Sequence, residues 1–230
     1  IVIGIIFFLT GIIFSGNIAT LLGANKQVYH MTSIYLKVLL MFGPAFVLNN
    51  VMNAFVRNDG NPRLSMIAML VGSFGNIILD YLLVIKFSMG MFGAVLATGF
   101  SPIMGLMVLS GHIVSENSNI KFKVAKIRAS FIKSIIMLGI PSFVAEMSSG
   151  IVIFVFNIII LDLQGNVGVA AYGVIANLAL VVISIYTGVA QGSQPLFSAA
   201  YGKNDKKMQK QLFKYAITAV TLISIVIYAV

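Results

Sequence analysis

Two acidic side chains lie inside long apolar runs of this 230-residue chain. Asp80 lies in the run 64–85, and Glu146 lies in the run 134–161. A charged side chain at the centre of a bilayer costs about 2.5–3.5 kcal/mol on insertion scales. A membrane protein that keeps such an acid usually pairs it, or uses it to couple the movement of ions or protons. The two acids therefore indicate a transport function.

Asp80 has a polar neighbour on its own helix face. Asn76 precedes it by four residues, the spacing that aligns two side chains on one face of a helix. Helical rise from Arg63 places Asp80 about 25 Å from the expected cytoplasmic end, in the outer half of the bilayer. A carboxylate and an amide can bind Na⁺ with help from carbonyl oxygens. The acid can also carry a proton, because a low-dielectric environment favours its neutral form. Spacing alone leaves a structural hydrogen bond near the outer headgroups equally open.

Glu146 occupies a second polar position, near the expected middle of its span. Asn157 follows it by eleven residues, which is three helical turns, so the two side chains share a face. Glu146 can serve as a proton carrier or as the counter-charge for a cationic substrate. A hydrogen bond to a neighbouring helix is the alternative.

Further polar side chains recur within spans that carry no formal charge. Asn177, Ser184 and Gln191 are spaced by seven residues within 163–202, and a cluster of amides lies in 35–57. Such stripes face a cavity or another helix rather than lipid. We predict a substrate cavity lined by Glu146, Asn157, Asn177, Gln191, Gln194, Asn49 and Asn53, with contact between helices as the alternative for the amides.

The composition predicts the elements that carry these residues. The chain is 59% hydrophobic and only 9% charged, with a mean hydropathy of +1.02. A spanning helix needs about 20 mostly apolar residues. We therefore predict an all-α, polytopic membrane bundle with about seven spans. The expected spans are residues 1–22, 35–57, 63–85, 91–114, 131–161, 167–200 and 211–230.

Catalytic and metal-binding patterns are not found in this sequence. The chain has no cysteine, which excludes disulfides and thiolate metal sites. Its two histidines, His30 and His112, are far apart in the sequence, and we expect both to be surface residues at helix ends. No phosphate loop or nucleophile motif is present. We predict a protein that is not an enzyme and has no cofactor, and whose only metal is Na⁺ at Asp80 and Asn76.

The positive charge is distributed unevenly between loops. Twelve of the 15 basic residues lie in loops near residues 60, 125 and 205. This asymmetry places those loops in the cytoplasm. It also explains the net charge of +9, so nucleic-acid binding is not needed to account for it. The long polar segment 116–128 is the expected linker between a part with four spans, 1–128, and a part with three, 129–230. Both chain ends fall within apolar runs, so we expect a fragment of a longer protein.

Four segments resemble the multidrug and toxic compound extrusion (MATE) family. They are Leu-Leu-Gly-Ala at 21–24 with Tyr-Leu at 35–36, Phe-Val-Arg-Asn-Asp-Gly-Asn-Pro at 55–62, Asn-Ile-Ile-Leu-Asp at 76–80, and Gln-Gly-Ser-Gln-Pro at 191–195 with Tyr-Gly at 201–202. The resemblance covers the third to the ninth of that family's twelve helices. It implies two lobes and alternating access. It also implies that Asn76 and Asp80, with Thr98 of the next helix, form the cation-coupling site.

The resemblance implies an antiporter that exports cationic amphipathic drugs in exchange for H⁺ or Na⁺. The pattern at 141–149 is similar to the bacterial drug-exporter branch, so the expected location is the bacterial plasma membrane, with a monomeric protein. Glu146 lies too close to Pro141 to match the acid that another branch uses on its seventh helix. The alternatives are a lipid-linked oligosaccharide flippase of the same superfamily, which needs a basic cavity, and a seven-helix receptor.

Overall fold

The computed structural model describes residues 2–24, 26, 28–115, 118, 120 and 129–229, apart from the side chain of Asn166. All regular structure in this described part is helical. The chain divides into two compact units, Ile1–Phe122 and Lys123–Val230. The helical architecture confirms the all-α class predicted from the apolar runs.

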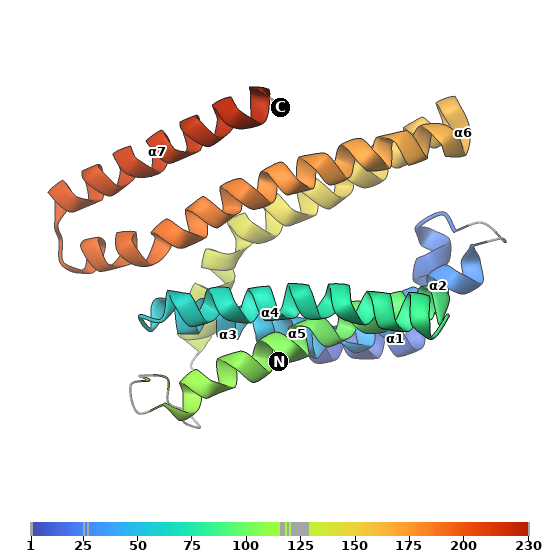
Figure 1. The fold of residues 1–230 in the computed structure, drawn as a ribbon, viewed down its shortest axis with the longest axis horizontal. Helices are drawn as coiled ribbons and strands as arrows, with labels where there is room; N and C mark the ends of the chain where they lie inside the picture. The colour runs from blue at the N-terminus through green and yellow to red at the C-terminus, as the bar shows by residue number, and fades with distance from the viewer. Residues whose placement is uncertain are drawn as a thin grey trace. The chain divides into compact units, whose positions relative to one another are not determined.

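The first unit is a bundle of packed helices. Its elements are α1 (Val2–Leu21), α2 (Tyr29–Met41), α3 (Gly43–Asn58), α4 (Pro62–Asp80), η1 (Tyr81–Lys86) and α5 (Gly90–Val114). Figure 1 shows α1, α3, α4 and α5 lying side by side. The buried core of the unit contains Met52, Val56, Ala68 and Leu109, from α3, α4 and α5.

The second span is bent rather than straight. A single helix was predicted over 35–57, but the structure has α2 and α3 meeting at an angle of 46° around Phe42. Pro44 lies in the first turn of α3. Proline has no N–H to donate and its ring clashes with the preceding turn, so a helix cannot pass straight through this position.

The helix that carries Asp80 changes its hydrogen-bond spacing directly after that residue. α4 ends at Asp80, and η1 continues it as a π-helix. At the end of this segment the Phe87 N–H donates to the Leu82 carbonyl at 2.8 Å. π-helical turns are rare and occur frequently at functional sites. Neither residue types nor spacing indicated this transition.

The second unit contains α6 (Ala129–Gly202) and α7 (Lys206–Ala229). α6 is interrupted at Gly165, whose backbone angles are φ 63° and ψ −159°. Figure 1 shows the chain turning back on itself within α6, with α7 following as a separate helix. The interruption produces two spanning segments, Ala129–Gly165 and Val167–Gly202, which confirms the two spans predicted there.

In the described residues six helices are long and apolar enough to cross a membrane, or seven when the bent pair α2–α3 counts as one span. This agrees with the predicted number. Large apolar side chains cover the flanks of these helices, and Leu138 and Ile135 are 81% and 71% exposed. A helix that is apolar on all sides is typical of a lipid environment. The protein is a multi-pass membrane protein.

Glycines allow the helices of the first unit to approach closely, and Gly11 provides a test. A Cβ at Gly11 would lie 2.5 Å from the Leu40 Cβ and 3.2 Å from the Lys37 carbonyl oxygen. Because both are attached to or part of the α2 backbone, Gly11→Ala must push α1 and α2 apart. We expect it to destabilise the protein by about 1–3 kcal/mol, measured by thermal unfolding in detergent.

The matched control for Gly11→Ala is Gly111→Ala on α5. A Cβ at Gly111 has no atom within 4 Å, so alanine should be neutral or slightly stabilising through its higher helix propensity. Equal melting temperatures for the two variants would show that the α1–α2 contact is not tight.

Candidate functional site

The predicted cation-coupling residues lie at the end of α4 and on α5. Asn76 and Asp80 are both partly buried on the last two turns of α4. The Nδ2 atom of Asn76 is buried and has no hydrogen-bond partner among the described residues. An unpaired buried amide costs about 1–3 kcal/mol. The two ends of an amide have nearly the same shape, so the same position can present an oxygen ligand instead.

Thr98 lies on α5, the helix packed against α4. Its hydroxyl donates to the Ala94 carbonyl at 3.0 Å, so its proton is used within its own helix and its oxygen remains an acceptor. The two helices are held together where the Ser101 hydroxyl donates to the Gly72 carbonyl at 2.9 Å. A Cβ at Gly72 would lie 3.0 Å from the Ser101 carbonyl oxygen. The three predicted residues therefore lie on two tightly packed helices.

Asn49 and Asn53 belong to a polar cluster inside the first unit. Asn53 Nδ2 donates to the carbonyl oxygen and the Oδ1 of Asn49 at 3.0 and 3.2 Å. Ser65 of α4 donates to Asn53 Oδ1 at 3.1 Å. Asn53 and Ser65 are only 7% and 1% exposed. The cluster joins α3 to α4. It corresponds to the alternative predicted for these amides from the sequence, contact between helices.

Removing this cluster should destabilise the first unit. Asn53→Ala deletes the contacts with Asn49 and leaves the buried Ser65 hydroxyl without its side-chain acceptor. Side-chain hydrogen bonds between membrane helices contribute about 1–2 kcal/mol each in model helices. We expect a lower melting temperature for Asn53→Ala than for Asn50→Ala, whose parent side chain is exposed. A similar melting temperature for both variants would contradict a stabilising role.

The remaining predicted cavity residues are distributed along α6. Glu146 is exposed and Asn157 is partly buried on the Ala129–Gly165 segment. Asn177 is exposed, and its Nδ2 donates to the Gly173 carbonyl at 2.8 Å. Gln191 is partly buried and Gln194 is exposed near the end of α6. All five lie on the two spanning segments of the second unit.

An apolar pocket of about 300 Å³ lies between the two halves of α6. Ser148 and Ser149 line it from one half, and Tyr172 lines it from the other. The Tyr172 ring also stacks on Phe156, with centroids 5.7 Å apart. None of the predicted cavity residues lines this pocket. Helical spacing places Ser149 close to the Glu146 face but gives no sign of Tyr172, because the contact depends on how the chain reverses at Gly165.

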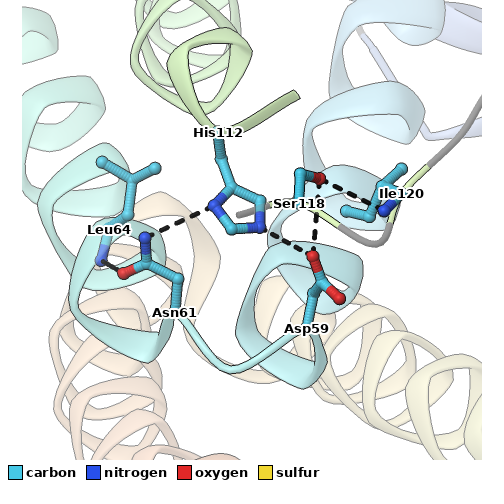
Figure 2. A network of polar contacts seen from close by, with 6 residues as sticks. All are labelled: Asp59, Asn61, Leu64, His112, Ser118 and Ile120. Carbon is cyan, nitrogen blue, oxygen red and sulfur yellow. Dashed lines mark hydrogen bonds and ion pairs between the residues drawn. The ribbon is translucent and has the colours of Figure 1, made fainter. Parts of the chain in front are cut away.

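The expectation that His112 is a surface residue was wrong. His112 is 5% exposed, and its Nε2 atom lies 2.8 Å from the Asp59 carboxylate. Asn61 lies on its other side, with Nδ2 3.4 Å from His112 Nδ1 (Figure 2). His30, by contrast, is exposed as expected. The partners of His112 are about 50 residues away in sequence, so spacing gave no sign of the contact. No group of three or more potential metal ligands occurs in the part of the chain that the structure describes.

An all-helical bundle with partly buried polar groups in spanning helices is typical of polytopic membrane proteins. The chain matches the MatE family over residues 1–82 and 122–230. Because this match covers most of the sequence, the chain belongs to the MatE family, as its motifs predicted.

Curated relatives agree with this assignment. The chain is 30% identical over 228 residues to the multidrug export protein MepA of Staphylococcus aureus, an alignment that covers 98% of this chain and 50% of that protein. A MepA from Staphylococcus saprophyticus is 29% identical over 224 residues, covering 96% of this chain and 49% of the relative. The chain therefore spans about half the length of the relatives that it matches.

Solved transporters share the fold. One is described as an outward-facing conformation of a multidrug resistance MATE family transporter of the MOP superfamily, with a TM-score of 0.82, 26% identity, and coverage of 99% of this chain and 52% of that one. A transporter of the MOP superfamily from Pyrococcus furiosus has a TM-score of 0.86 and 25% identity, with coverage of 99% and 51%. Its description states that reverse polarity of the binding pocket suggests a different function. These likenesses support placing the chain within part of a two-lobe transporter fold.

Proposed function

We propose that this chain is part of a secondary active multidrug exporter, which moves cationic amphipathic compounds out of the cell in exchange for H⁺ or Na⁺. The observation that carries the proposal is Asp80, an acid within a spanning helix, one helical turn from the buried amide of Asn76. The names of the MepA relatives support the export of several drugs.

Coupling requires that the ion bind one conformation better than the other. Asp80 is suited to this role because it ends α4, at the point where the helix widens into η1. Binding of Na⁺ or H⁺ neutralises the carboxylate within the membrane, which changes the free energy of burying it. Thr98 and Asn76 supply oxygen atoms that can complete a Na⁺ site. The predicted residues Glu146, Asn157, Asn177, Gln191, Gln194, Asn49 and Asn53 remain the proposed contacts for substrate or for helix packing.

The distribution of basic residues supports the orientation of the protein in the membrane. The turn after α3 and the turn before α7 carry Arg57, Arg63, Lys203, Lys206 and Lys207. Cytoplasmic loops are enriched in such residues. We propose that the loops near 60, 125 and 205 face the cytoplasm of a bacterial cell, and that the transporter works as a monomer.

The proposal is tested with the full-length protein in sealed proteoliposomes. Efflux of a cationic dye is followed first under an imposed pH gradient and then under an imposed Na⁺ gradient. Movement that depends on one gradient identifies the coupling ion. If neither gradient moves the dye, drug antiport is excluded for that substrate, and a lipid-linked oligosaccharide becomes the substrate to test. The Pyrococcus furiosus protein, whose description suggests a different function, is the reason to include that second assay.

A further inference from the structure

A buried polar network connects three segments at one end of the first unit. Figure 2 shows His112 of α5 between Asp59 and Asn61, which lie in the turn between α3 and α4. His112 is 5% exposed and the Asp59 side chain is 11% exposed, so both groups are largely shielded from water. The contacts of the network determine where its hydrogen atoms lie.

The orientation of the Asn61 side chain is fixed by the start of α4. Asn61 is the N-cap residue, and its Oδ1 accepts a hydrogen bond from the Leu64 N–H at 3.1 Å. N-cap side chains satisfy backbone donors that have no partner within the helix. Because Oδ1 is used in this way, the atom that faces His112 is the donor Nδ2, at 3.4 Å from Nδ1.

The protonation of the ring follows from that orientation. A neutral imidazole has one donor nitrogen and one acceptor nitrogen. Nδ1 faces an N–H donor, so it must be the acceptor and carries no hydrogen. The ring proton therefore lies on Nε2 and is donated to Asp59 Oδ2 at 2.8 Å. Both nitrogens are satisfied only in this tautomer.

We propose that His112 is a positioning residue, held as the neutral Nε2–H tautomer, and that it forms a proton-sensitive latch between the α3–α4 turn and the segment after α5. When a proton is added at Nδ1, the N–H of the His112 ring and the N–H of the Asn61 amide point at each other and repel. The Asn61 amide can avoid this only by rotating, which removes its oxygen from the Leu64 N–H and uncaps α4. This inference does not depend on what the protein transports.

Charged groups of both signs lie in the same stretch of sequence as the latch. The Asp59 carboxylate favours a cationic His112, while Arg57 lies in the last turn of α3 and Arg63 in the first turn of α4. The Asn61 N–H donor at Nδ1 is the contact in this network that favours the neutral ring. Exchanging that donor for an acceptor should therefore reverse the response to pH.

The latch also reaches the chain beyond α5. The Ser118 hydroxyl lies 3.5 Å from Asp59 Oδ2 and accepts from the Ile120 N–H at 3.2 Å. Ile120 packs against the buried core of Met52, Val56, Ala68 and Leu109. The sequence continues from there to Lys123, where the second unit begins. Protonation of His112 is thus linked to the contacts that Ser118 and Ile120 make with the first unit.

The first test uses the full-length protein with ¹⁵N-labelled histidine in lipid nanodiscs. The ring signals of His112 are identified by their loss in His112→Gln. Near pH 7.5 we expect the ¹⁵N shifts of a protonated Nε2 and an unprotonated Nδ1. Signals of the opposite tautomer, or of an imidazolium at this pH, would overturn the assignment. The tautomer is read from the unmodified protein, and the His112→Gln variant serves only to assign the signals.

The second test follows hydrogen exchange of the Leu64 N–H between pH 7.5 and 5.5. The Met208 N–H serves as an internal reference, because the carboxylate of Asp205 caps it at 2.9 Å without a histidine. Relative to this reference, exchange at Leu64 should become about tenfold faster as His112 takes up its second proton. Exchange at Leu64 that follows Met208 throughout would contradict the latch.

Two variants separate the latch from simple packing. His112→Gln keeps a donor for Asp59 and an acceptor for Asn61, and it cannot titrate, so Leu64 should stay protected at both pH values. Asn61→Asp still caps α4 but offers an acceptor to Nδ1, so His112 should be doubly protonated and the turn more protected at the lower pH. Wild-type pH dependence in either variant would show that another group is responsible.

Discussion

Asp80→Asn is expected to abolish gradient-driven dye efflux while leaving the protein folded. Asparagine has nearly the shape of aspartate, so the packing at the end of α4 should be retained. It cannot become negatively charged, so it offers neither a charge for Na⁺ nor a site for H⁺. We expect the gradient-dependent rate to fall at least about tenfold, which corresponds to about 1.4 kcal/mol. The rate is measured in proteoliposomes, and the fold is checked by thermal unfolding.

The matched control is Asp162→Asn, the same chemical change on the exposed aspartate of α6. We expect this variant to retain coupled efflux. Equal loss in both variants would indicate a general effect of charge, and unchanged efflux in Asp80→Asn would exclude coupling by Asp80. Glu146→Gln in the same assay tests the proposed contact with cationic substrate, where a change that depends on the dye used would support it.

Gly165→Ala is expected to destabilise the second unit through strain in the backbone. Gly165 has φ 63° and ψ −159°, a region that is accessible almost only to glycine. A Cβ at this position would have no atom within 4 Å, so a side chain meets no steric obstacle. The cost of a side chain is therefore backbone strain, of about 1–3 kcal/mol. We expect a lower melting temperature and a lower yield of folded protein.

Gly173→Ala is the control variant: it replaces a glycine of the same helix that has ordinary helical backbone angles. Gly173 is helical and also has no atom near its Cβ position, so alanine should stabilise it slightly. If both variants had the same melting temperature, the reversal of α6 would not depend on the backbone of Gly165. A second strained substitution, Gly165→Val, should have a larger effect than Gly165→Ala.

Particular residues show how far the sequence could predict the candidate site. The four-residue spacing of Asn76 and Asp80 was enough to place them on one face of a spanning helix. That the Nδ2 atom of Asn76 is buried, and that a π-helix begins after Asp80, could not be read from spacing. Both properties depend on how α5 packs against α4. The same applies to Asn53, whose partner Ser65 is on another helix.

The sequence by itself determined the membrane class, the number of spans and the family. These properties depend on local features, since about 20 apolar residues suffice to cross a bilayer wherever they occur in the chain. Only the tertiary structure decided which polar groups meet. His112 and Asp59 are 53 residues apart, and they become partners because α5 returns to the α3–α4 turn. Contacts of this kind depend on packing between helices, and local periodicity carries no information about it.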